Sequence, residues 1–72
     1  MLNPYWVAQT LASLPIWVQN SLVDFSTEMA ARECASGATP YNVCHCMSNL
    51  LREAEQVGDL EKWRHGEVHH EP

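Results

Sequence analysis

The sequence predicts an all-α protein: a small helical bundle built on an antiparallel αα-hairpin, with a short N-terminal helix and a short C-terminal helical turn. Three observations predict this class. Proline and glycine residues divide the chain into segments with helix start and stop signals at their ends. Apolar residues in the two longest segments recur at intervals of three and four positions. No segment is rich in strand signals, and 72 residues are expected to form one domain.

The N-terminal segment predicts a short helix from Pro4 to about Ser13. Asn3 suits the N-cap, where its side chain can accept a hydrogen bond from a free backbone N–H. Pro4 suits the first helical position because no intrahelical bond is lost there. Pro15 is then expected to end this helix and to begin the next one, since a proline fits a first turn but not a helix interior.

The second helix is predicted to run from Pro15 to about Ser36, with Gly37 as its C-terminal cap. Glu28 and Arg32 are four residues apart and should form a favourable pair on its surface. Apolar residues at 4-3-4 spacing predict its core stripe: Val18, Leu22, Phe25 and Met29.

The third helix is predicted from Pro40 to Val57, between the N-cap residue Thr39 and the closing Gly58. Its pattern is the clearest in the chain, because apolar residues follow the 4-3-4-3 spacing of packed helices. The residues of this predicted seam are Val43, Met47, Leu50, Ala54 and Val57.

The connection between the second and third helices is expected to span only residues 37–39, which makes the two helices antiparallel neighbours. Asp59 should cap a last short turn that holds Leu60 and Trp63 and stops at Gly66. The domain is therefore expected to cover residues 1–66. Residues 67–72 are polar and predict a flexible tail.

The apolar content is high for so small a chain. Hydrophobic residues make up 46% of the sequence and include three tryptophans, whereas a domain of this size buries only about 60% of its unfolded surface. We therefore expect part of the apolar surface to be covered by a second chain, most simply in a homodimer. Interface cores are rich in Tyr and Trp and poor in charge. The predicted protein-binding residues lie near helix starts, in or near the part of the chain with no charge: Tyr5, Trp6, Trp17 and Tyr41.

The charge distribution argues against nucleic acid and membrane partners. The formal net charge is −5, and the four Lys and Arg residues are spread along the chain, whereas nucleic-acid binding needs several on one face. A helix-turn-helix-like DNA-binding protein is an alternative, but the third helix has its only basic residue at Arg52, far from the positions that read bases. No run of about 18 apolar residues exists, and no basic region precedes the apolar N-terminal part. A cytoplasmic protein is expected.

Three cysteines and a histidine raise the alternative of a small zinc-binding module built from Cys34, Cys44, Cys46 and a histidine. On a helix, however, Cys44 and Cys46 would point roughly 200° apart. A zinc site would need residues 40–47 to be non-helical, so no metal is expected and the cysteines are interpreted as small apolar residues. A disulfide from Cys34 to either of the other two stays geometrically open, although a reducing cytosol would keep it reduced.

Neither catalytic residues nor cofactors are expected, so the chain is not expected to be an enzyme. A catalytic cysteine needs a base within hydrogen-bond reach and a third group to orient it, and His45 diverges from its cysteine neighbours on a helix. Gly66 lies between His65 and His69, which favours a solvated tail over a metal site. The expectation is a non-catalytic protein-binding protein, such as a small inhibitor, adaptor or regulatory factor of the size common among phage-encoded proteins.

Overall fold

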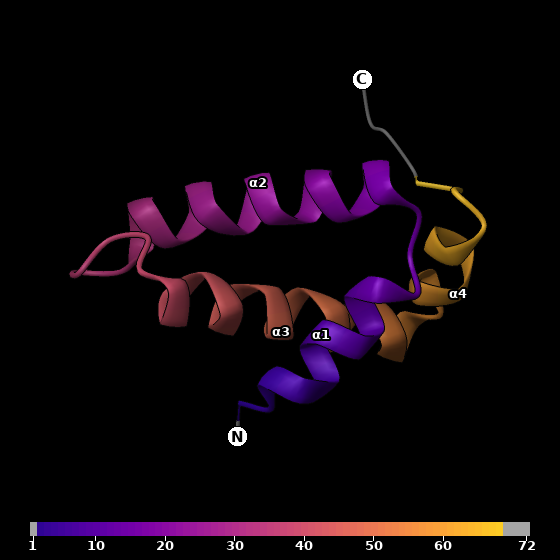
Figure 1. Cartoon of the computed structure of the whole chain (residues 1–72), viewed down its shortest axis with the longest axis horizontal. Helices are drawn as coiled ribbons and strands as arrows, with labels where there is room; N and C mark the ends of the chain where they lie inside the picture. The colour runs from indigo at the N-terminus through magenta and orange to yellow at the C-terminus, as the bar shows by residue number, and fades with distance from the viewer. Residues whose placement is uncertain (1, 69–72) are drawn as a thin grey trace.

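The computed structural model describes residues 2–68, which contain four α-helices and no strand. This confirms the all-α class. The helices are joined by short connections and form one small bundle (Figure 1). Their bounds are Pro4–Ala12 for α1, Ile16–Glu33 for α2, Pro40–Val57 for α3 and Asp59–Arg64 for α4.

Helix α3 is the centre of the bundle. Helices α2 and α3 lie side by side and run in opposite directions, so the expected antiparallel hairpin is present (Figure 1). Helix α1 crosses α3, and α4 folds back at the open end of the hairpin, where α2 begins and α3 ends. The main tertiary interfaces are therefore those that α3 forms with each of the other three helices.

The predicted caps of α1 and α3 are confirmed. The backbone N–H of Trp6 donates to Oδ1 of Asn3 at 3.1 Å, and the N–H of Asn42 donates to Oγ1 of Thr39 at 3.1 Å. Each bond satisfies an N–H group that has no partner inside the first turn of its helix. Gly58 closes α3 at φ 84°, in the left-handed region where a residue without Cβ is unstrained.

The predicted end of α2 is wrong. The helix ends at Glu33, not near Ser36, because Cys34 is already extended, with φ −101° and ψ 134°. Gly37 has a positive φ of 79°, but it lies in a turn outside the helix, where its N–H donates to the carbonyl of Cys34 at 2.9 Å. The connection to α3 therefore covers residues 34–39 rather than 37–39.

A side chain of α3 fixes this longer connection. Nδ2 of Asn42 donates to Oγ of Ser36 at 2.9 Å and to the carbonyl oxygen of Gly37 at 2.8 Å. These two bonds link the turn to the first turn of α3. These bonds stabilise a connection in which α2 ends early. They could not be predicted from the residues at the end of α2, because the donor side chain lies on α3.

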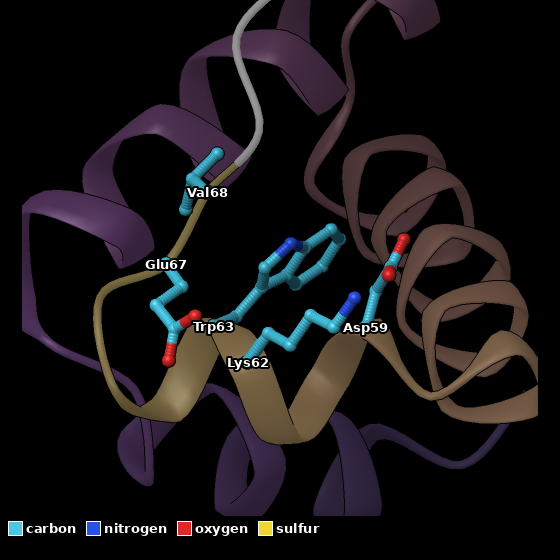
Figure 2. Close-up of a pocket in the computed structure, with 5 residues that line it drawn as sticks. All are labelled: Asp59, Lys62, Trp63, Glu67 and Val68. Atoms are coloured by element: carbon cyan, nitrogen blue, oxygen red, sulfur yellow. The ribbon is translucent and has the colours of Figure 1, made fainter.

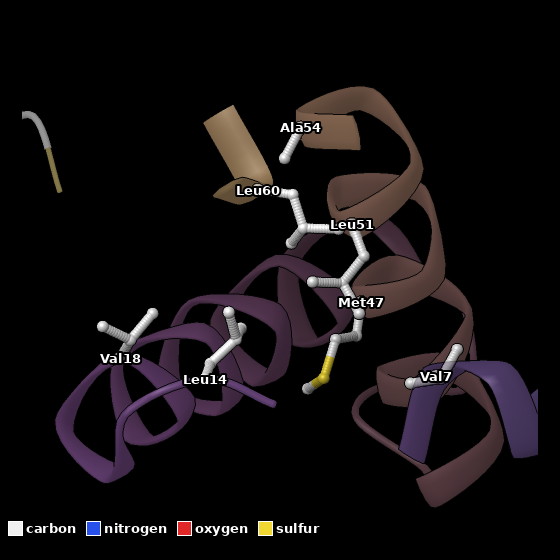
Figure 3. Close-up of a cluster of buried hydrophobic side chains, with 7 residues drawn as sticks. All are labelled: Val7, Leu14, Val18, Met47, Leu51, Ala54 and Leu60. Carbon is white, nitrogen blue, oxygen red and sulfur yellow. The ribbon is translucent and has the colours of Figure 1, made fainter. Parts of the chain in front are cut away.

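The core is one cluster that joins the helices and the link between α1 and α2 (Figure 3). Leu51 is its centre, with no exposed surface. Trp6, Leu22 and Trp63 are partly buried and pack against the cluster. Its buried members are Val7, Leu14, Val18, Met47, Leu51, Ala54 and Leu60.

The predicted core stripe of α2 is half right. Val18 is buried and Leu22 packs against the core, but Phe25 is 50% exposed. The buried positions beyond Leu22 are Ser26 and Ala30, which have no exposed surface. The buried face therefore follows a row of residues four apart, and the small side chains on this row let α2 lie close to α3.

The predicted seam of α3 is rotated in the same way. Met47 and Ala54 are buried as expected, but Leu51 takes the central position in place of Leu50. Val57 is 67% exposed and is not part of the core. The rotation leaves an apolar edge of α3 that the rest of the described chain covers only in part: Leu50 is partly buried and Val57 is exposed.

The packed part of the chain reaches Val68. The N–H of Glu67 donates to the carbonyl of Lys62 at 2.9 Å, and Val68 lies partly buried against the core. Residues 69–72 lie outside the described residues, so the predicted tail and its boundary stay a prediction. None of the helices in residues 2–68 is both long enough and apolar enough to cross a membrane.

Candidate functional site

An open groove runs between the C-terminal half of α2 and the outer edge of α3, with a cavity volume of about 300 Å³. Helix α2 supplies its wall up to the point where the helix ends, and α3 supplies the opposite wall from its second turn onward. We call it the α2–α3 groove. The residues that line it are Met29, Glu33, Cys34, His45, Cys46, Asn49, Leu50 and Glu53.

The floor of this groove is apolar. Met29 faces it from α2 and Leu50 from α3. Phe25 precedes Met29 by one helical turn, and Val57 follows Leu50 by two turns, so the helical period places both on the same edges. Because the two helices are antiparallel, these residues extend the groove in one direction. We call these residues the apolar strip: Phe25 and Met29 on α2, and Cys46, Leu50 and Val57 on α3. Along α3, from Cys46 to Val57, the strip measures roughly 16 Å, at 1.5 Å per residue.

The rim of the groove is acidic. Glu33 and Glu53 line it from opposite helices, and none of its lining residues is Lys or Arg. The whole chain adds to this field with a formal net charge of −5. An apolar floor between two carboxylates favours an occupant that has both an apolar and a basic face.

The three arginines of the described chain make their contacts outside the α2–α3 groove. The guanidinium carbon of Arg52 lies 4.6 Å from the ring centroid of Trp6, a cation–π geometry. Nε of Arg64 donates to Oγ of Ser13 at 3.1 Å. Arg32 pairs with Glu28 at 2.6 Å, as expected from their spacing. These three arginines lie on separate helices and do not form the basic face that a DNA-binding helix requires.

The cysteines divide into a pair and a single residue. Cys34 and Cys46 both line the α2–α3 groove, whereas Cys44 packs partly buried against the core. Burial raises the pKa of the Cys46 thiol, and the nearby Cys34 thiol and Glu33 carboxylate raise it further. At neutral pH the Cys46 sulfur is therefore a protonated thiol.

The condition for the zinc alternative is not met. Residues 40–47 lie inside α3, where Cys44 and Cys46 diverge as a helix requires. Within residues 2–68, no three His, Cys, Asp or Glu side chains are placed to hold one metal ion. We therefore do not propose a zinc site.

The histidines of the described chain are at the surface. The ring of His45 stacks on that of Tyr41, with centroids 6.2 Å apart and planes 9° from parallel. Nε2 of His65 lies 3.4 Å from Oε2 of Glu61, an exposed pair that exists as an ion pair only when the histidine is protonated. His69, which the sequence places in a solvated tail rather than in a metal site with His65, lies outside the described residues.

The four predicted binding aromatics do not form one surface. Tyr5 and Tyr41 are exposed, at 72% and 65%, but Tyr5 is on α1 and Tyr41 begins α3. Trp17 begins α2 and so lies at the opposite end of the hairpin from Tyr41. Trp6 is half-buried against the core. Tyr41 is the one nearest the α2–α3 groove, because it stacks on the lining residue His45.

A second cavity, of about 490 Å³, lies beside α4. The indole of Trp63 projects into it, with Asp59 and Lys62 at its edge and Glu67 and Val68 across from them (Figure 2). A lysine between two carboxylates gives this cavity mixed charge, so it favours no single class of ligand. Trp63 is partly buried and also packs against the core.

The sequence interpretation missed the α2–α3 groove. It placed Phe25, Met29 and Leu50 in the core, whereas Phe25 is half exposed and the other two line the groove. One feature of the sequence indicates the groove. The apolar positions of α2 form a band that is wider than one neighbouring helix can cover, and Ser26 and Ala30 lie on a neighbouring face whose side chains are small.

Comparison with known proteins adds no relative: no protein-family model, no curated protein and no solved structure matches this chain. The geometry of the bundle and of its groove is therefore the basis for a function.

Proposed function

We propose that this chain is a non-catalytic, cytoplasmic protein-binding protein whose α2–α3 groove accepts an amphipathic helix with Lys or Arg side chains on its flanks. The observation that carries the proposal is the pairing of an apolar strip with an acidic rim. Met29 and Leu50 are partly buried and line the groove together with the exposed carboxylates of Glu33 and Glu53. Phe25 and Val57, which continue the strip, are exposed. Large exposed apolar strips on small proteins mark interaction sites, and charges at their edges select the partner.

The dimensions of the strip suit a helix. A partner helix that spans roughly 16 Å makes about three turns, which present apolar side chains at positions i, i+3 or i+4, and i+7. Such anchors would contact Phe25 and Met29 on one wall and Leu50 and Val57 on the other. Basic residues next to the anchors would reach the carboxylates of the rim.

A second copy of this chain fits the groove less well. A symmetric pairing through the groove would bring Glu33 and Glu53 of both copies together, and like charges at an interface are repulsive. Charge complementarity thus favours a foreign partner in the groove. As a function, this corresponds to an adaptor, inhibitor or regulatory factor that recognises a basic helical segment.

The rim carboxylates can be tested with model peptides. A labelled Leu/Lys amphipathic peptide of about 14 residues, or four helical turns, is expected to bind the chain, and a Leu/Glu peptide of the same pattern is not. The double variant Glu33→Gln/Glu53→Gln should weaken Leu/Lys binding by about 3- to 10-fold at low salt, because it removes two partly solvated charge contacts. Fluorescence anisotropy at two salt concentrations measures both effects.

A matched control separates the groove from net charge. The variant Asp24→Asn/Glu55→Gln removes two exposed carboxylates from the same two helices, on faces turned away from the groove. It changes the net charge equally and should leave affinity within about twofold. Equal weakening by both double variants, or equal binding of the Leu/Glu peptide, contradicts the proposed site.

Self-association is a separate proposal, carried by a different surface. Ile16, Trp17 and Val23 are exposed by 69%, 47% and 39%, in the part of α2 that precedes the first charged residue. We expect a dimer at micromolar concentrations, measured by light scattering over a dilution series. Trp17→Ala should shift the mass towards the monomer, and His45→Ala, at the far end of the hairpin, should not. A monomer at every concentration refutes self-association but does not contradict the proposed binding of a helix in the groove.

A further inference from the structure

Cys34 and Cys46 both line the α2–α3 groove, Cys34 from the end of α2 and Cys46 from α3. Cys34 is the residue at which α2 stops, and Cys46 lies in the second turn of α3. Both line the same cavity and both are partly accessible to solvent. The Cys34 thiol is among the groups that raise the pKa of the Cys46 thiol, in agreement with their shared position in the groove. The two thiols are thus neighbours, one just beyond the end of α2 and the other on α3.

The third cysteine is excluded from this pair. Cys44 precedes Cys46 by two residues on a helix, which turns its side chain away by roughly 200°, and it packs against the core instead of the groove. Cys34 has extended φ and ψ angles, and its remaining helical bond is the one from its N–H to the carbonyl of Ala30, at 3.0 Å. It can therefore make the small adjustment that the strict distance and dihedral demands of a disulfide impose.

We propose that Cys34 and Cys46 are an oxidation site: a low-molecular-weight disulfide of the glutathione type converts them into an intramolecular disulfide that closes the groove at the end next to the hairpin turn. The part of this proposal that concerns binding rests on the proposed function of the groove. The formation of the bond does not.

The chemistry balances as two thiol–disulfide exchanges. The Cys34 thiol loses its proton and attacks one sulfur of the small disulfide, so that a mixed disulfide forms and one small thiolate leaves. The Cys46 thiol then loses its proton and attacks the Cys34 sulfur, which expels the second small thiolate. Each leaving thiolate takes up one of the two protons. The oxidant is reduced to two thiols, and the protein loses two hydrogens.

Closure follows from the position of the bond. A disulfide would draw the two side chains together and fix the end of α2 to the second turn of α3. A partner side chain could then no longer lie between Cys34 and Cys46. The oxidised groove keeps Phe25, Leu50 and Val57 but loses its end pocket, so a helix that uses the full strip would bind less tightly.

The bond is tested by mass spectrometry on the full chain. After treatment of the reduced protein with oxidised glutathione and alkylation of the remaining thiols, the product should lack two hydrogens, carry one alkyl group and hold no glutathione. Arg32 and Arg52 flank all three cysteines, so tryptic digestion leaves them on one peptide, and variants must assign the bond. Cys44→Ala should still close, with no alkyl group added. Cys34→Ser and Cys46→Ser should instead keep a glutathione adduct.

Two outcomes would overturn the oxidation site: a bond that requires Cys44, or a wild-type chain that accumulates stable glutathione adducts or disulfide-linked dimers on a non-reducing gel. Binding of the Leu/Lys peptide to Cys44→Ala, reduced and oxidised, tests closure, and the oxidised form should bind about tenfold more weakly. Unchanged affinity would refute closure. If the reduced protein does not bind the peptide, the proposed function fails, while the mass result still decides whether the disulfide forms.

Discussion

Leu51→Ala is expected to lower the free energy of unfolding by about 2–5 kcal/mol, the range for a buried leucine whose neighbours cannot collapse into the space. Leu51 has no exposed surface and lies on α3, the helix against which the other three pack. A domain of this size has a stability of about 4–11 kcal/mol, at 0.05–0.15 kcal/mol per residue. The variant should therefore lose a large share of its stability, as measured by urea unfolding followed by circular dichroism.

The neighbouring leucine is the matched control. Leu50→Ala removes the same atoms from the same helix, but Leu50 lines the open groove and is only partly buried. Its cost should be less than half that of Leu51→Ala. If Leu50→Ala is the more damaging change, α3 presents the face that the sequence spacing predicted, and the groove described here would be part of the core.

Ser26→Ala is expected to change stability in the opposite direction, with a gain of about 1–2 kcal/mol. Ser26 has no exposed surface, and within the described chain its hydroxyl oxygen has no hydrogen-bond partner. An alanine methyl group fills nearly the same space without an unsatisfied polar atom, and alanine also has the higher helix propensity. Urea unfolding of the variant at neutral pH measures the gain.

Ser21→Ala isolates the propensity contribution, because Ser21 is exposed on the same helix. It should stabilise by no more than about 0.5 kcal/mol. A loss of stability in Ser26→Ala would mean that the hydroxyl donates to a backbone carbonyl in solution, as serine side chains in helices can do.

The sequence was sufficient for the four helices and for the caps of α1 and α3 because those signals are local, whereas the predicted caps Gly37 of α2 and Asp59 of α4 are wrong. Asn3, Thr39 and Gly58 act on backbone groups within four residues of themselves, so their roles can be derived from the order of the chain. The early end of α2 could not be derived in this way. It is stabilised by Asn42, whose amide bonds to the turn from the next helix.

The choice of buried face could not be predicted because it depends on the neighbouring helix. Hydrophobicity ranks Phe25 and Met29 above Ser26 and Ala30, but close approach of two helices favours the smaller pair. The α2–α3 groove exists because α2 packs on α3 through its smaller side chains, so a sequence interpretation that chose the other face of α2 could not predict it. The spacing of the cysteines predicts that Cys34 lies near Cys44 or Cys46 but does not say which. The way α2 packs on α3 decides this, because Cys46 and not Cys44 lines the groove with Cys34.

The central position of α3 also constrains the order in which the bundle can fold. The contacts of α3 with α2 and α4 join segments that are adjacent along the chain, so they close short loops at a small entropic cost. The contact of α1 with α3 has to close a loop that includes all of α2. The folding route of lowest contact order forms the contacts of α3 with α2 and α4 first, in the transition state. Helix α1 then docks on α3. Predominantly local helical contacts place the folding time in the microsecond-to-millisecond range.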